Sequence, residues 1–147
     1  MALSKLIYTS AMSHSCDLKE IENILVQSRS RNTIKNITGI LYYSNKFFFQ
    51  YLEGELNDIE QLFQSIAKDK RHTDVRLIEV SSIEHREFGD WSMAYILQSE
   101  RLIPLYQKLF KTEYFDPSKI TAEKARILTL TLKKELPKAY CSNSGVL

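Results

Sequence analysis

Cysteine, histidine and glycine are scarce in this sequence, and each shortage excludes a class of site. The 147 residues include two cysteines, three histidines and four glycines. Cys16 and Cys141 form no C-x-x-C pair, so the spacing of a structural zinc site is missing and we predict no metal centre. Walker A, G-x-G-x-x-G, G-x-S-x-G and H-E-x-x-H motifs are also absent, which removes the common signatures of nucleotide binding and hydrolysis.

Long apolar runs and an excess of one charge are lacking too. No run approaches the 18 residues of a membrane span, and residues 1–10 do not resemble a signal peptide. We therefore expect a cytoplasmic protein that is not in a membrane, with both cysteines as free thiols. Lysine and arginine number 20 against 18 acidic residues, a balance that argues against nucleic acid as a partner.

The composition that remains is typical of a folded domain. The sequence is 44% hydrophobic and 26% charged. A chain of this length buries roughly 68–70% of its unfolded surface, so it forms a core without metals or disulfides. One domain is expected.

The first half of the chain predicts a strand, a helix and a hairpin. Residues 3–10 form a short β-rich run, and Asp17 with Glu20 is a capping box for a helix over 17–30 that ends near Asn32. The runs 37–44 and 47–54 flank Ser44-Asn45-Lys46, which indicates a tight hairpin.

The second half repeats the alternation of helix and strand. Asn57 with Glu60 predicts the start of a helix that ends at 68–71, and strands are expected over 75–83 and 91–97. The order β-α-β-β-α-β-β is typical of an α+β, ferredoxin-like fold with two helices over one sheet face.

The C-terminal region is expected to cover the other sheet face, because the strands carry apolar residues on both sides. A helix is predicted over 102–110, and Thr121 is the N-cap of another that Pro137 stops. We divide the chain into a domain over 1–97, a helical extension over 98–137 packed on it, and a flexible tail over 138–147.

Several polar side chains could carry chemistry. Alternation along neighbouring strands lets Tyr8 and Gln50 meet on the helix-covered face, where they either satisfy each other or serve a site. Ile24, Ser28, Arg31 and Asn32 form one helical stripe, which is either an amphipathic boundary with a C-cap Asn or the wall of an amide-lined cleft.

Two further groups have alternative interpretations. Asp69, Arg71 and His72 end the second helix, where cations favour the helix dipole or contact a phosphate or ribityl chain. Trp91 and Met93 are two residues apart, so we expect them to share one face of the last strand, in the core or in an exposed aromatic patch.

Taken together, these residues resemble the BLUF family of blue-light sensors that use flavin. The resemblance covers residues 3–97 and is carried by KLIYTS with Tyr8, the helix end from Ser28 to Asn32, NITGILYYSNKFFFQYLEGE with Gln50, KDKRH at 68–72, and FGDWSMAY with Trp91 and Met93. The chain is similar to the short, stand-alone members with C-terminal helices. Arg31 departs from the family pattern, in which His or Asn is common.

The resemblance implies a role for each residue. FAD, with FMN as the alternative, would lie between Ile24 and Ile66, with Asn32 at its O4/N3 edge. Gln50 would bridge Tyr8 and the flavin, and light would drive electron and proton transfer from Tyr8. Trp91 and Met93 would relay the change to the C-terminal helices. The remaining cofactor contacts would come from Ser28, Arg31, Asp69, Arg71 and His72.

The resemblance also implies a sensor that is not an enzyme. It would act on a separate signalling protein in a light-dependent complex and assemble as a homo-oligomer. Two other classes stay open on the residues alone. One is a small phosphate-handling hydrolase in which Arg71 and Asn32 hold an anion. The other is an RNA-binding sheet that stacks bases on Phe47, Phe49 and Tyr51.

Overall fold

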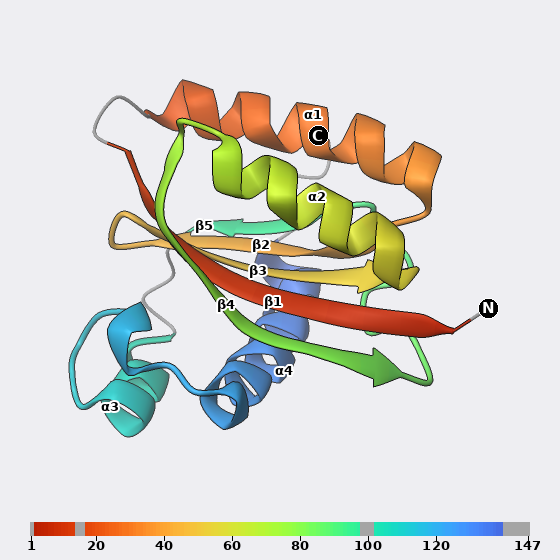
Figure 1. Ribbon diagram of the computed structural model, residues 1–147. Coiled ribbons are helices and arrows are strands. Elements are labelled where there is room, and N and C mark those ends of the chain that lie inside the picture. Colours follow the sequence, from red (N-terminus) through yellow and green to blue (C-terminus); the bar gives the residue numbers. More distant parts are fainter. Residues whose placement is uncertain (1, 14–16, 98–101, 140–147) are drawn as a thin grey trace.

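A five-stranded sheet with helices on both faces forms the molecule (Figure 1). The structure is a computed structural model that describes residues 2–13, 17–97 and 102–139. Along the chain the elements are β1 (Leu3–Met12), α1 (Leu18–Lys35), β2 (Thr38–Ser44), β3 (Phe47–Gly54), α2 (Leu56–Lys68), β4 (His72–Ile83), β5 (Ala94–Leu97), α3 (Ile103–Phe110), the 3-10 helix η2 (Pro117–Lys119) and α4 (Ala122–Ala139).

The sheet has the strand order β4-β1-β3-β2-β5. All neighbours are antiparallel except β2 and β5. Helices α1 and α2 cross one face, and α3 and α4 lie under the other (Figure 1). The predicted α+β, ferredoxin-like fold with helices on both sheet faces is confirmed.

Alternation along the strands builds a separate core on each face. The upper core, under α1 and α2, contains Leu6, Tyr8, Leu41, Phe48 and Leu52 from the sheet. The lower core contains Ile7, Ile40, Phe49 and Tyr51, packed against the α4 stripe of Ala125, Leu128, Leu132 and Leu136. Because Phe49 and Tyr51 are buried there and the partly buried Phe47 packs against the same core, the three rings do not form an exposed platform for stacking bases.

Two backbone features set the central register. Asn45 and Lys46 adopt φ values of 53° and 66°, as a tight hairpin turn requires, so the predicted hairpin is confirmed. A Cβ at Gly39 would lie 2.0 Å from the Tyr51 carbonyl oxygen, so only glycine fits there. These features align β2 with β3 and place Leu41 beside Gln50.

The predicted end of the first helix is wrong. Helix α1 continues through Asn32 to Lys35, and Asn36 is its left-handed cap at φ 56°. The backbone N–H of Asn36 bonds to the carbonyls of Asn32 and Thr33, which closes the last turn. Asn32 is therefore an interior residue whose side chain is not needed as a cap.

Three other boundaries also differ from expectation. Helix α2 starts at Leu56 directly after β3, so Asn57 and Glu60 form no capping box, and Glu55 occupies the N-cap without a side-chain bond. Strand β4 starts at His72, because a bulge with Asp74 at φ 49° extends its pairing with β1. Helix α4 begins with the predicted Thr121 cap but runs past Pro137 to Ala139, since one lost N–H bond near a helix end is tolerated.

Some predictions fall on undescribed residues. Cys16, Cys141 and positions 140–147 of the predicted tail lie outside the described residues. The division at 97/98 remains a prediction. None of the described helices is both long and apolar enough to cross a membrane.

Candidate functional site

A cavity of about 190 Å³ opens between α1 and the C-terminal end of α2, above the sheet. Ile24 of α1 and Ile66 of α2 form its aliphatic walls, and Tyr8, Leu41 and Gln50 form its floor. The full lining is Tyr8, Ile24, Gln27, Ser28, Arg31, Leu41, Gln50, Ser65, Ile66, Asp69, Arg71 and His72. All the predicted cofactor-binding residues are present except Asn32.

Tyr8 and Gln50 face each other across β1 and β3 and are directly paired in the sheet register. The Tyr8 hydroxyl donates a hydrogen bond to Gln50 Oε1, so the predicted contact is confirmed. The other end of the amide is also used, because Nε2 donates to Met93 Sδ at 3.2 Å. The floor is thus a chain of three side chains rather than an isolated pair.

The Tyr8 phenol is neutral in this environment. Burial raises its pKa, and the positive charge of nearby Arg31 offsets only part of that effect. Phe63 packs against the ring with centroids 5.5 Å apart. The hydroxyl therefore keeps its proton near neutral pH and acts as a hydrogen-bond donor.

Asn32 of α1 is fully buried, with 0% of its surface exposed, and is not among the residues that line the cavity. Its Nδ2 donates to the Ser92 carbonyl at 2.9 Å, while Oδ1 has no hydrogen-bond partner among the described residues. A buried acceptor without a donor costs about 1–3 kcal/mol. This oxygen therefore fits a ligand with an N–H group, such as the imide of a flavin.

The cluster at the end of α2 is an ion-pair network. Arg71 Nη2 lies 2.6 Å from Asp69 Oδ2 and also donates to Gln27 Oε1 at 3.1 Å. The hydrogen bond from the Arg71 guanidinium holds the pKa of Asp69 below its usual range. Arg71 is thus engaged by a carboxylate and Asn32 does not line this cavity, which does not favour a shared anion site of a hydrolase.

His72 is buried beside the floor. Its Nδ1 lies 2.8 Å from Ser10 Oγ, and its ring packs on Phe48 at 4.8 Å. Burial lowers its pKa to about 4, an effect that the Asp69 carboxylate opposes and Arg71 reinforces. His72 is therefore a neutral donor or acceptor at pH 7.

The prediction that Trp91 and Met93 share a face is wrong. Both precede β5, which begins only at Ala94, so strand alternation does not apply to them. Met93 is buried in the upper core beside Gln50, whereas Trp91 packs against the lower core. The two side chains therefore lie on opposite faces of the sheet.

Sequence reasoning missed several residues of this site. Gln27, Leu41 and Ser65 line the cavity, and Arg29 Nε holds the Met93 carbonyl at 2.9 Å. Leu41 could have been found, because it pairs with Gln50 across the predicted hairpin. Nothing in the local pattern pointed to Arg29, whose partner is 64 positions away.

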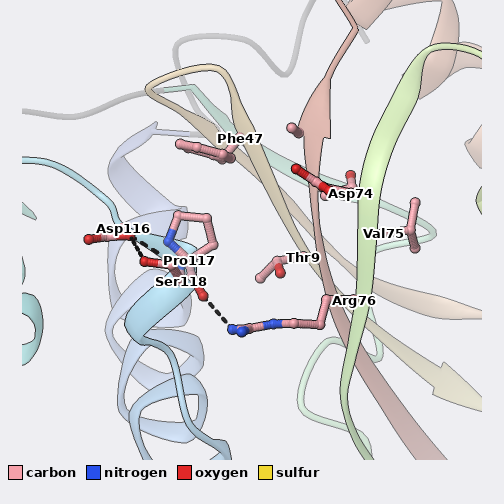
Figure 2. A pocket seen from close by; sticks show the side chains of 10 residues that line it. Thr9, Phe47, Asp74, Val75, Arg76, Asp116, Pro117 and Ser118 are labelled. Atoms are coloured by element: carbon pink, nitrogen blue, oxygen red, sulfur yellow. Dashed lines mark hydrogen bonds between the residues drawn. The ribbon is translucent and has the colours of Figure 1, made fainter.

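A second cavity lies on the opposite face of the sheet (Figure 2). It has about 440 Å³ and separates β1 and β4 from η2, where the Arg76 side chain donates to the Pro117 carbonyl. None of the predicted cofactor residues lines it. Among the described residues no cluster of metal ligands is present.

The family model described as sensors of blue-light using FAD, abbreviated BLUF, matches residues 3–94. The chain belongs to the BLUF family. Its cofactor class is therefore flavin.

Relatives and solved structures agree with this assignment. The blue light- and temperature-regulated antirepressor BluF of Escherichia coli (strain K12) is 31% identical over 91 residues, which are 62% of this chain and 23% of that protein. The chain thus spans less than a quarter of that relative's length.

Two solved structures match over most of their length. The photo-activated state of BlsA has a TM-score of 0.84 and 28% identity, over 89% of this chain and 94% of that one. The dark state of BlrB, described as a BLUF protein, has a TM-score of 0.74 and 28% identity, over 92% of this chain and 98% of that one. The BLUF domain is the sensory part of such proteins.

Proposed function

We propose that this chain senses blue light through a flavin held in the α1–α2 cavity, and that its photochemistry runs along Tyr8, Gln50 and Met93. The observation that carries the proposal is the hydrogen-bond chain through both ends of the Gln50 amide. Ile24 and Ile66 would enclose the ring, and Asn32 Oδ1 would accept from its imide. Ser28, Arg31, Asp69, Arg71 and His72 would surround the remainder.

A bound flavin supplies an electron acceptor when it absorbs blue light. Tyr8 would then give up one electron and its phenolic proton: the electron would pass to this acceptor, and the proton would follow to the same acceptor through the bond to Gln50 Oε1. Both would return to Tyr8 afterwards. The low-dielectric cavity strengthens each bond of this chain, so a rearranged bond persists long enough to act as a signal.

Gln50 is suited to be the two-state element. A half-turn of its amide exchanges Oε1 and Nε2, so the group facing Tyr8 changes from an acceptor to a donor. The same turn removes the donor from Met93 Sδ. The two orientations therefore differ at both ends of the chain, which is what a switch requires.

The output would pass through the Glu84–Met93 segment to the C-terminal helices. Phe88 of this segment is buried against α4 in the lower core, and Glu87 pairs with Lys133 of α4 at 3.1 Å. The change would then alter contacts with a separate protein and between copies of a homo-oligomer. The proposed sensor has no catalytic activity of its own, acts in the cytoplasm and uses FAD.

A light-minus-dark absorption spectrum tests this function. Purified protein should be yellow, and blue light should shift its flavin band to the red with recovery in the dark. The same protein after heat denaturation is the control, because released flavin shows no such shift. Protein that stays colourless after incubation with FAD and FMN would contradict the proposal.

A further inference from the structure

Arg31 is an uncommitted cation at the mouth of the cavity. Among the described residues its guanidinium has no hydrogen-bond or ion-pair partner, whereas the neighbouring Arg71 is held by Asp69. The side chain is exposed as a whole, yet it lines the cavity. A guanidinium with a free fork at a cavity mouth fits a phosphate, which it can bind through two parallel hydrogen bonds.

Next to Arg31, α1 carries an apolar patch on its outer surface. Ile34 is 81% exposed and Val26 is 59% exposed, with Ser30 between them. An exposed helix face normally carries polar residues, so two large aliphatic groups one turn on either side of a serine are unusual. We call Val26, Ser30 and Ile34 the α1 patch.

The patch is continuous with the cavity. The hollow over the patch and the cavity share two lining residues, Gln27 and Arg31. Arg31 lies one turn before Ile34 and one turn after Gln27, so it stands at the border between the two. From Val26 to Ile34 the patch is about 12 Å long, which accommodates an adenosine.

We propose that the α1 patch binds the ADP half of FAD, with the diphosphate at Arg31 and the adenine over Val26, Ser30 and Ile34. This inference rests on the proposed function, since it requires the flavin ring in the cavity. The chemistry of each part matches its place. The diphosphate meets the free guanidinium, the flat face of adenine covers the aliphatic groups, and the Ser30 hydroxyl can bond to a ring nitrogen.

A ligand series separates the parts of this site. Riboflavin has neither phosphate nor adenine, FMN has one phosphate, and FAD has a diphosphate and an adenine. Dissociation constants in the dark, from quenching of flavin fluorescence by apoprotein, give each contribution. We expect FAD to bind about tenfold more tightly than FMN. Arg31→Gln should raise the dissociation constants of FMN and FAD, and this increase should be about tenfold larger than the increase for riboflavin.

Ile34→Ser tests the adenine contact directly. The affinity for FAD should fall about fivefold, and the affinities for FMN and riboflavin should stay unchanged. Leu130→Ser is the matched control, because Leu130 is 46% exposed on α4 and lies away from the cavity. The control should bind all three ligands like the wild type.

Two outcomes would overturn the inference. One is equal affinity of the wild type for FMN and FAD. The other is an Ile34→Ser variant with unchanged FAD affinity but a smaller mass by light scattering, which would make the patch a contact between subunits. Either result leaves the photoreceptor proposal intact, provided that the wild type binds flavin and shows the light-induced shift. Failure to bind any flavin would instead remove the proposed function.

Discussion

At the scale of single residues, the cavity depends on polar atoms whose partners are fully determined. Tyr8 donates to Gln50, Gln50 donates to Met93, and Asn32 holds Ser92 while its Oδ1 faces no donor among the described residues. Each of these groups is buried, so removing the partner of any one of them costs free energy, because the group that remains is left unpaired. Three substitutions separate their roles.

Tyr8→Phe should abolish the red shift and preserve the fold and the yellow colour. The substitution keeps the ring and its contact with Phe63 but deletes the only proton of the Tyr8–Gln50 bond. Excitation should then end in fluorescence. Light-minus-dark absorption and emission spectra of the variant measure both effects. A shift like that of the wild type would exclude Tyr8 as the obligatory donor.

Asn32→Ala should weaken flavin binding by about 5- to 150-fold, which corresponds to the roughly 1–3 kcal/mol of a buried polar group without its partner. Flavin titration of apoprotein measures the loss. Asn23→Ala is the control, because Asn23 is exposed on the same helix. Equal affinity of both variants would remove Asn32 from the site.

His72 should make stability depend on pH. Its pKa is about 4 in the folded protein and about 6.5 when exposed, so between these values only the unfolded chain takes up the proton. Stability should therefore fall as the pH drops from 6.5 towards 4. Urea unfolding at pH 7.5 and pH 5 should show a loss about 2 kcal/mol larger in the wild type than in His72→Gln. The same pH dependence in both proteins would contradict this assignment.

At the scale of elements, the connection from β4 to β5 is held by one buried carboxylate. Glu53 of β3 accepts hydrogen bonds from the backbone N–H groups of Glu87 and Phe88, both at 2.7 Å, and from Thr38 Oγ1 at 2.6 Å. Arg86 adds a bond to Thr38 at 2.8 Å. This arrangement fixes the start of the segment that ends at Met93.

Glu53→Ala should destabilise the fold by about 3 kcal/mol or more, because it leaves two backbone N–H groups and a hydroxyl without their acceptor. It should also loosen the Gln50–Met93 contact at the far end of the segment. Glu84→Ala, an exposed change in the same segment, should have little effect. Urea unfolding of the two variants decides the matter, and similar midpoints would show that Glu53 does not anchor the segment.

At the scale of the whole molecule, the stretch from Trp91 to Met93 joins the two cores. Met93 contacts the cavity floor, and Trp91 packs on the side of the sheet that α3 and α4 cover. The Trp91 carbonyl also accepts from Gly39 N at 3.2 Å, which ties the stretch to β2. A movement of Gln50 can therefore reach the opposite face through three residues.

Met93→Ala should retain the red shift but weaken its transmission to the C-terminal helices. The substitution removes the sulfur that Gln50 Nε2 contacts and leaves Tyr8 with its partner. Limited proteolysis of the region after β5, in the dark and under blue light, should differ less than in the wild type. Leu77→Ala, on the exposed edge strand β4, is the control. A light-dependent difference equal to that of the wild type would exclude Met93 as the relay.

Patterns within short stretches of the sequence were enough to predict most of the fold. The two-residue period of the strands separated Tyr8 and Gln50 from Ile7 and Phe49. Leu128, Leu132 and Leu136 recur every four residues, which is the spacing of one helix side, and all three are buried in the lower core. These predictions succeed because burial of apolar side chains repeats with the geometry of each element.

Predictions failed where contacts between distant segments decide the backbone. The end of α1 depends on Asn36 adopting a left-handed conformation, and the start of β4 depends on a bulge opposite β1. Trp91 and Met93 were assigned to one face because a strand was expected there. Their actual directions follow from Gly39, Asn32 and Arg29, which hold the Trp91, Ser92 and Met93 carbonyls in turn.

The sequence by itself determined the order of elements and the two apolar faces of the sheet, because these depend on local spacing and on residue type. Most of the side chains that line the cavity were expected from the resemblance to the BLUF family, and Gln27, Leu41 and Ser65 were not expected at all. Only the tertiary structure decided which atoms of those side chains meet. Within the described part of the chain, Asn32 Oδ1 has no hydrogen-bond partner, while its amide nitrogen donates to a carbonyl 60 positions away. Met93 meets Gln50 although the two residues are 43 positions apart, and hydrogen bonds over such separations leave no local pattern in a sequence.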